Sequence, residues 1–197
     1  MSHYFTDQKD TKSHRKTIDY IFAGKLFSFV TDHGVFSKDA VDHATIKLLE
    51  TVKIPKGATV LDLGCGYGVI GIVLQKIYQA AVTMSDINMR ALTLAQLNAE
   101  KNGVRVEIIK SDGFTSIESL YDHIVVNPPI RIGKAAMYSM LVQAKAYLQN
   151  NGTLWVVIHK KHGAQSLARY LADYFTVERA LRYKGIYVFA CRKTLTA

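Results

Sequence analysis

The sequence predicts a doubly wound α/β fold, in which helices cover both faces of a mostly parallel sheet of about seven strands. Short apolar segments alternate with amphipathic ones through most of the 197 residues. A glycine-rich turn, Asp62-Leu63-Gly64-Cys65-Gly66-Tyr67-Gly68, joins one apolar segment to an amphipathic one. Only a short polar turn separates the last two apolar segments, which is typical of an antiparallel hairpin. We therefore expect a single domain over residues 1–197, with an antiparallel hairpin at its C-terminal end.

The N-terminal region precedes this alternation. Residues 1–15 are polar and charged, and we expect a loose basic arm there. Apolar segments at 17–22 and 26–30 flank a turn with Gly24 and predict a small hairpin. Residues 16–37 are thus expected to form that hairpin and the loop that follows it.

The remaining elements follow in order. Ser37 has the side chain of an N-cap, so a helix is expected between it and Val52. Strands are then expected at 59–63, 81–85, 106–110, 123–126, 153–158, 177–181 and 186–191. Helices are expected at 69–78 and 88–101, from Met137 through Leu148 to Asn150-Asn151-Gly152, and near 166–174. This order is Rossmann-like.

Composition limits the class of protein. The formal net charge is +9 and the excess of Lys and Arg lies toward both ends, which favours a polyanionic partner. No apolar run approaches the roughly 20 residues that span a membrane, and no signal peptide is visible. Cys65 and Cys191 form no paired motif, so a reducing cytoplasm is expected. The histidines show no metal-ligand spacing, so no metal is expected, and a monomer is favoured.

Polar stretches follow four of the predicted strands, at 62–68, 85–88, 111–114 and 127–130. In an open α/β sheet, ligands bind beyond the carboxyl ends of the strands. The four stretches are therefore expected to form one ligand site.

The spacing around the glycines indicates the kind of cofactor. Asp86 lies about 20 residues after them, where an acid binds ribose hydroxyls in dinucleotide folds. However, the glycines alternate as GxGxG, no second phosphate-binding loop is visible, and Asp62 would repel a pyrophosphate. The pattern favours S-adenosylmethionine, a cation, over NAD, and an NAD dehydrogenase is the more distant alternative.

With Asp112 and Asn127-Pro128-Pro129 added, the pattern resembles class I S-adenosylmethionine-dependent methyltransferases. Gly34-Val35-Phe36-Ser37 with Asp42, and the stretch at 127–134, narrow the resemblance. They are similar to the short single-domain form of the small-subunit ribosomal RNA guanine-N2 methyltransferases, over nearly the whole chain from Thr17.

The resemblance implies a role for each cofactor residue, with S-adenosylhomocysteine as the product. Glycine backbone passes beneath the cofactor, Asp62 lies near its amino-acid end, and Asp86 takes the ribose hydroxyls. Asp112 lies beside the adenine, and Phe36 with Ser37 closes one side of the pocket. The residues so implied are Asp62, Gly64, Gly66, Gly68, Asp86, Ile87, Asp112, Gly113, Asn127, Phe36 and Ser37.

Asn127, Pro128 and Pro129 are the predicted catalytic residues. An exocyclic amino nitrogen is a poor nucleophile, because its lone pair is delocalised into the ring. The Asn127 side-chain oxygen and the Pro128 carbonyl can accept its two N–H bonds, orient the lone pair and offset the developing positive charge. The prolines fix the backbone that carries both acceptors.

The substrate is expected to be RNA, either ribosomal RNA or a ribosomal subunit. Ile130 follows the prolines, where many amino-methyltransferases carry a base-stacking aromatic, so either Phe36 stacks or the base is held less tightly. Arg131 and Lys134, beside the prolines, are expected to meet phosphates. Lys160 and Lys161, with His162, follow the strand at 153–158 on the ligand side of the sheet, where they either meet RNA phosphates or form a solvated loop.

Two further functions stay open at this stage. One is methylation of a protein glutamine or a DNA adenine, which digestion of labelled product would separate from RNA methylation. The other is a non-catalytic RNA-binding or ribosome-assembly factor that retains the cofactor fold, against which the intact Asp62, Asp86 and Asn127 argue.

Overall fold

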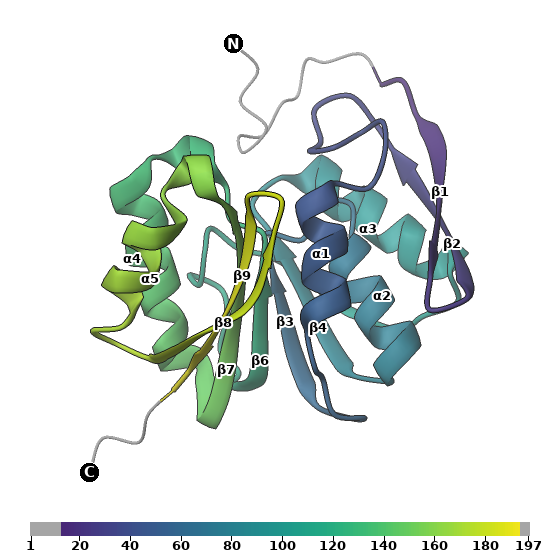
Figure 1. The fold of residues 1–197 in the computed structure, drawn as a ribbon. Coiled ribbons are helices and arrows are strands. Elements are labelled where there is room, and N and C mark those ends of the chain that lie inside the picture. Colours follow the sequence, from purple (N-terminus) through teal and green to yellow (C-terminus); the bar gives the residue numbers. More distant parts are fainter. Residues whose placement is uncertain (1–12, 194–197) are drawn as a thin grey trace.

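The computed structural model describes residues 13–193, so most of the predicted basic arm lies outside the described residues. Within this range the predicted architecture is confirmed. A seven-stranded sheet has the order β5-β4-β3-β6-β7-β9-β8, and β1 and β2 form a separate antiparallel pair. The strands β3 to β7 run parallel, whereas β9 is antiparallel to both β7 and β8 (Figure 1).

The bounds of the elements agree with most of the predicted ranges. The strands are β1 (Lys16–Phe22), β2 (Lys25–Thr31), β3 (Thr59–Leu63), β4 (Ala81–Asp86), β5 (Glu107–Lys110), β6 (Tyr121–Val126), β7 (Leu148–His159), β8 (Thr176–Tyr183) and β9 (Ile186–Arg192). The α-helices are α1 (His43–Thr51), α2 (Val69–Tyr78), α3 (Met89–Lys101), α4 (Lys134–Gln143) and α5 (Ala164–Leu171).

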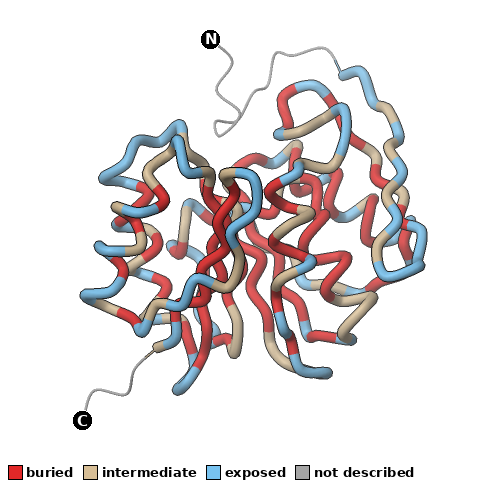
Figure 2. Tube along the Cα trace, in the orientation of Figure 1, coloured by how far each residue is buried: buried red, intermediate tan, exposed pale blue. Residues whose placement is uncertain are grey.

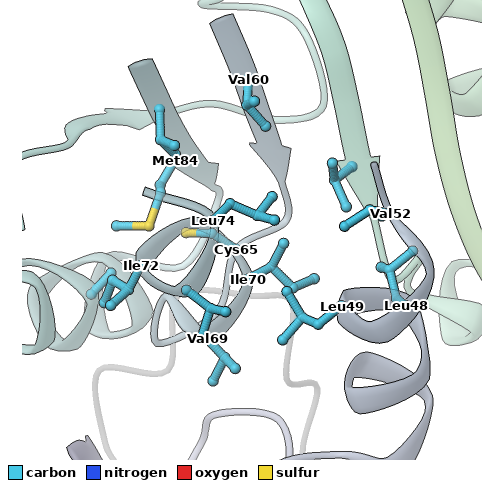
Figure 3. Packing of buried hydrophobic residues seen from close by; sticks show 14 of the residues in the cluster. Leu48, Leu49, Val52, Val60, Cys65, Val69, Ile70, Ile72, Leu74 and Met84 are labelled. Atoms are coloured by element: carbon cyan, nitrogen blue, oxygen red, sulfur yellow. The ribbon is translucent and has the colours of Figure 1, made fainter. Parts of the chain in front are cut away.

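Helices cover both faces of the sheet and divide its core into two clusters. The helices α1, α2 and α3 lie on one face and α4 and α5 on the other (Figure 1). On the first face, Leu48 and Leu49 of α1 pack beside Ile70 of α2 (Figure 3). The central strands are buried throughout, while the outer surfaces of the helices are exposed (Figure 2). Burial on both faces explains why the last three residues of β6 and the second half of β7 are almost entirely apolar.

The chain order places β3 at a switch point of the sheet. It pairs with β4 on one side and with β6 on the other, and both neighbours are parallel to it. The connections from β3 and from β6 therefore leave in opposite directions from the same edge. A crevice at that edge is where an open sheet of this kind binds its ligand.

Asn98 of α3 and its C-cap residue, Asn102, hold the N-terminal hairpin on the fold. The Asn98 amide accepts from the Val30 backbone N–H at 2.6 Å and donates to the Val30 carbonyl at 2.9 Å. Asn102, one turn further along, binds the backbone of Ser28 in the same way, at 3.1 and 2.9 Å. These bonds satisfy the backbone of β2 that faces the helix and direct the chain after β2 toward the crevice.

The predicted start of α1 after Ser37 is wrong. Asp42 caps the helix, and its carboxylate accepts from the Thr45 backbone N–H at 3.0 Å. Ser37 instead sits in a turn at φ +53°, where its hydroxyl donates to the Ala40 carbonyl. Ser and Asp side chains both cap helices well. Asp42 is the cap here, and its carboxylate also contacts Asn127 across the crevice.

The predicted helix through Leu148 is too long. α4 ends at Gln143, a 3-10 turn (Ala144–Tyr147) follows, and Leu148 already belongs to β7. Gly152, which resembles a helix stop, lies instead where two backbones approach, because a Cβ there would be 2.9 Å from the Gln149 carbonyl oxygen. The expected helix near 166–174 is displaced as well, since α5 ends at Leu171.

No helix in the described range has the length and apolar character needed to cross a membrane.

Candidate functional site

A cavity of about 450 Å³ opens at the carboxyl ends of β3, β4, β6 and β7. Its size is in the range of small-molecule sites. The glycine turn and Asp86 form one wall, and Asn127 with the two prolines forms another. The loop before α1 and the end of β7 complete the lining. Three of the four predicted stretches, at 62–68, 85–88 and 127–130, therefore meet at this cavity, whereas the stretch at 111–114 does not line it.

The glycine turn forms part of the first of these walls. The N–H groups of Gly64 and Cys65 donate to the Ser85 carbonyl at 2.8 and 2.9 Å, which fixes the turn on β4. A Cβ at Gly64 or Gly66 would meet no atom within 4 Å, so the bare backbone there borders open space. At Gly68 a Cβ would lie 3.4 Å from the Ala95 Cα, so this glycine serves the packing of α2 on α3.

Asp86 supports the turn and faces the cavity. Its two carboxylate oxygens accept from the backbone N–H groups of Gly66 and Asn88, each at 2.9 Å. Burial raises the pKa of this carboxyl, while the N–H groups that it accepts from oppose the rise. A carboxylate held in this way can still accept from ligand hydroxyls with its remaining lone pairs.

Asp62 lies behind the turn and does not line the cavity. It is fully buried, and its Oδ2 accepts from the Gly71 backbone N–H at 2.8 Å. Its Oδ1 has no hydrogen-bond partner among the described residues. Burial raises the pKa of Asp62 to about 7, against the lowering effect of the Gly71 bond. Asp62 thus fixes the first turn of α2, and it reaches a ligand only through that backbone.

We expect the free energy of unfolding to fall as the pH rises from about 4 to about 7, because Asp62 holds its proton more tightly when folded. The stabilisation from protonated Asp62 is fully present below the pKa that this carboxyl has in the unfolded chain, and it is lost as the pH rises through the pKa in the folded protein. One such group gives a slope of up to about 1.4 kcal/mol per pH unit. Urea unfolding of the wild type and Asp62→Asn across this range measures it. Parallel pH profiles for the two proteins would exclude this role for Asp62.

The loop before α1 is held against the cofactor side of the cavity. The Tyr67 hydroxyl donates to the Ser37 carbonyl at 3.2 Å, and the Asn88 amide donates to the Gly34 carbonyl at 3.3 Å. Arg90 donates to the His33 carbonyl at 3.0 Å. Phe36 and Ser37 line the cavity, and the Phe36 side chain is exposed at its rim.

Asn127 follows β6 and is oriented by two residues at the start of α1. Its amide nitrogen donates to Asp42 Oδ2 and to Thr45 Oγ1, each at 3.0 Å. A carboxylate only accepts, so the amide must turn its NH2 group toward Asp42. The Asn127 Oδ1 is thereby left as an acceptor at the cavity wall.

Thr45 is not among the predicted site residues, and Asp42 is predicted only as part of the resemblance. The capping spacing Asp42-x-x-Thr45 was a usable signal for the helix start, but not for a contact with Asn127, which is 85 residues away from Asp42.

Several predicted site residues lie outside the cavity lining. Ser111 donates its backbone N–H to the Asp86 carbonyl at 3.0 Å, so the loop with Asp112 and Gly113 follows the same sheet edge. Lys134 is turned away, with its Nζ 5.3 Å from the Tyr138 ring centroid. The predicted residues that do not line the cavity are Asp62, Gly68, Ile87, Asp112, Gly113, Lys134 and Lys160.

His159, the last residue of β7, and His162, in the 3-10 turn after it, both line the cavity, and His159 is not among the predicted site residues. The His159 and His162 ring centroids are 5.8 Å apart in an edge-to-face arrangement. The His162 Nδ1 is buried without a partner among the described residues, and burial lowers the pKa of this imidazole. Ile130, Arg131 and Lys161, which are predicted to contact the substrate, also line the cavity. Residues 13–193 contain no group of three or more His, Cys, Asp or Glu side chains that could hold a metal ion.

Comparison with known proteins connects this site to one family. The model of the methyltransferase small domain family matches residues 26–190. The uncharacterized protein YbxB of Bacillus subtilis (strain 168) is 36% identical over 97% of this chain and 98% of its own length. Ribosomal RNA small subunit methyltransferase C of Pasteurella multocida (strain Pm70) is 39% identical, and the match covers 63% of this chain and 39% of that protein. The chain thus spans less than half the length of this methyltransferase C relative.

Solved structures show the same fold. The T. thermophilus 16S rRNA N2 methyltransferase (RsmC), in complex with AdoMet and guanosine, superposes with a TM-score of 0.81 at 24% identity, over 91% of this chain and 50% of that one. A methyltransferase from Pyrococcus furiosus superposes with a TM-score of 0.70 at 19% identity, over 83% of this chain and 91% of that one.

Proposed function

The chain belongs to the methyltransferase small domain family and is an S-adenosylmethionine-dependent methyltransferase, and we propose that it methylates an exocyclic amino nitrogen, guanine N2 of small-subunit ribosomal RNA. One observation carries the choice of acceptor. The NH2 group of Asn127 is bound to Asp42 and Thr45, which leaves its oxygen as an acceptor at the cavity wall. An amino group that is to be methylated has N–H bonds to donate to such an oxygen.

The residues of the cavity fit the cofactor. The open space above Gly64 and Gly66 accommodates a ligand against bare backbone, and Asp86 can accept from ribose hydroxyls. Asp86 lines the cavity, and a carboxylate there suits a cationic, hydroxyl-bearing ligand better than a pyrophosphate. When bound, the cofactor supplies a methyl group activated by its sulfonium.

The catalytic turn positions the substrate. Asn127 Oδ1 and the Pro128 carbonyl accept the two N–H bonds of the amino group, so the nitrogen lone pair is oriented and its developing charge is stabilised. The two prolines limit the backbone motion of both acceptors. Positioning of this kind supplies much of the barrier reduction in a displacement, and no side-chain base is required.

The charge of the cavity mouth supports RNA as the substrate. Arg131 and Lys161 line the cavity on the Asn127 side, and the whole chain carries a net charge of +9. The methyltransferase C relatives are named for small-subunit ribosomal RNA, and the structural neighbour with a TM-score of 0.81 is a 16S rRNA N2 methyltransferase. Their names supply the proposed nucleotide, guanine, and the proposed atom, N2.

Transfer of labelled methyl from S-adenosylmethionine tests the proposal. Small-subunit ribosomal RNA, both naked and in partly assembled subunits, is incubated with the protein, and label is expected in the RNA. Label in DNA or in a protein glutamine, with none in either form of the RNA, would contradict the choice of substrate.

Asp42→Asn is expected to lower kcat about tenfold with little change in the KM for S-adenosylmethionine. Asparagine caps helices as well as aspartate does, so α1 is retained. However, the amide of an asparagine at position 42 can donate as well as accept, so Asn127 can turn either end of its own amide toward it. The Asn127 oxygen is then no longer forced toward the substrate. Steady-state kinetics measure kcat and the KM for S-adenosylmethionine separately.

The double variant Asp42→Asn/Asn127→Ala is the control for this positioning role. Once the Asn127 amide is gone, Asp42→Asn should have no further effect on kcat. Additive losses would show that Asp42 acts independently of Asn127.

A further inference from the structure

Basic side chains gather around the β8–β9 turn and the segment after β7, at the end of the sheet where the cavity opens. We call this group the basic ridge, and it consists of Lys47, Lys160, Lys161, Arg182 and Lys184 together with Tyr183. The Lys160 backbone N–H donates to the Gly185 carbonyl at 2.7 Å, which joins the β8–β9 turn to the segment that lines the cavity. Figure 1 shows this turn at the same end of the sheet as the loop leading into α1.

The Tyr183 ring has two cations of the ridge beside it, whereas the Arg182 guanidinium lies 5.9 Å from the Tyr187 ring centroid. Tyr183 is 37% exposed and lies at the end of the edge strand β8. The Lys47 Nζ lies 4.6 Å and the Lys184 Nζ 5.4 Å from the ring centroid. Arg182, Tyr183 and Lys184 are all exposed, as the pale turn between β8 and β9 in Figure 2 shows. An exposed aromatic face beside several cations is how proteins bind single-stranded nucleic acid.

The ridge retains most of its positive charge. Lys47 forms an ion pair with Glu50. In the part of the chain that the structure describes, Lys160, Lys161, Arg182 and Lys184 form no ion pair with an acidic side chain. Four uncompensated cations therefore lie at this end of the sheet, and one of them, Lys161, lines the cavity that holds Asn127.

We propose that the basic ridge binds the RNA strand that flanks the target nucleotide, with Arg182 and Lys184 on phosphates and Tyr183 stacked on a neighbouring base. This inference rests on the proposed function. A base can enter the cavity only when it is out of its stack, which exposes the faces of the bases beside it. Phosphate contacts would then fix the position of the strand, and the cavity would select the base.

The first test is the double variant Arg182→Gln/Lys184→Gln, with Lys53→Gln/Arg105→Gln as the matched control. Lys53 and Arg105 are exposed residues that precede β3 and β5, at the opposite end of the sheet from the cavity. Binding of a mixed-sequence single-stranded RNA is measured over a range of salt concentrations. Loss of two phosphate contacts should reduce the slope of log K against log salt by about 1.4. The control should keep the wild-type slope, and equal slopes in both variants would overturn the proposal.

Tyr183 is tested by a matched pair of substitutions. Tyr183→Leu should weaken RNA binding about tenfold, because the stacking face is lost. Tyr183→Phe should bind as the wild type does. Equal RNA affinities for the two variants would show that Tyr183 does not stack on a base. Binding of S-adenosylmethionine and kcat at saturating RNA are expected to stay unchanged in every ridge variant, which also shows that each variant is folded.

Failure of this inference is distinguishable from failure of the proposed function. Wild-type protein that methylates RNA, while the ridge variants bind RNA like their controls, overturns the ridge alone. Wild-type protein that binds no RNA and methylates none overturns both.

Discussion

Replacing Asn127 with alanine is expected to lower methyl transfer by about 10²–10³-fold and to leave the affinity for S-adenosylmethionine nearly unchanged. The substitution removes the side-chain oxygen that Asp42 and Thr45 hold at the cavity wall. The amino group would then face only the Pro128 carbonyl, and its developing charge would lose one of two oriented acceptors. Single-turnover transfer and calorimetric titration of the cofactor separate the two quantities.

Asn150→Ala is the matched control for this prediction. Asn150 is an exposed asparagine near the start of β7, away from the cavity, so its loss should not change the transfer rate. A transfer rate of Asn127→Ala within a few-fold of the control would remove Asn127 from the mechanism.

Replacing Asp86 with alanine is expected to weaken S-adenosylmethionine binding about 100-fold. The carboxylate accepts from two backbone N–H groups, those of Gly66 and Asn88, and it faces the cavity where ribose hydroxyls are expected. The variant would lose these bonds and leave buried N–H groups unpaired, so the glycine turn would no longer be held in one conformation. Equilibrium binding of the cofactor measures the effect.

Asp112→Ala gives the comparison, because the Asp112 carboxylate is exposed and lies outside the cavity lining. Its effect on cofactor affinity should be smaller than that of Asp86→Ala. An equal or larger loss would show that the adenine contact implied by the resemblance dominates, and that the Asp86 bonds contribute little to binding.

The fold could be predicted from the sequence to a large extent. The strands at 59–63 and 81–86 and the helices that follow them were predicted within one or two residues, because apolar periodicity and buried runs are local signals. The docking of the N-terminal hairpin on α3 could not be predicted. Asn98 looks like an ordinary polar helix residue and Asn102 like a helix C-cap, until β2 supplies the backbone groups that they bind.

The errors arose where one residue pattern serves two structures. Ser37 and Asp42 are both good helix caps, and the choice of Asp42 depends on Thr45 and on the distant Asn127. Gly152 looked like the end of a helix, but it allows close approach of two backbones within a long strand. Tertiary contacts decided both cases.

The candidate site was predictable where its residues sit at strand ends. The glycine turn, Asp86 and Asn127 follow β3, β4 and β6, and the topology rule brings such residues together. Thr45 was not predictable in this way, because it reaches the cavity through the packing of α1 across the sheet. His162 follows the predicted strand at 153–158 and reaches the cavity through the turn after β7.

Mass spectrometry of the nucleosides released from small-subunit ribosomal RNA tests the central claim most directly. RNA or partly assembled subunits are incubated with S-adenosylmethionine and either the wild type or Asn127→Ala, and are then digested. We predict N2-methylguanosine with the wild type and almost none with the variant, since the Asn127 oxygen positions the amino group. A methyl group found only on a ring nitrogen or a carbon, or equal yields of N2-methylguanosine from the two proteins, would contradict the account.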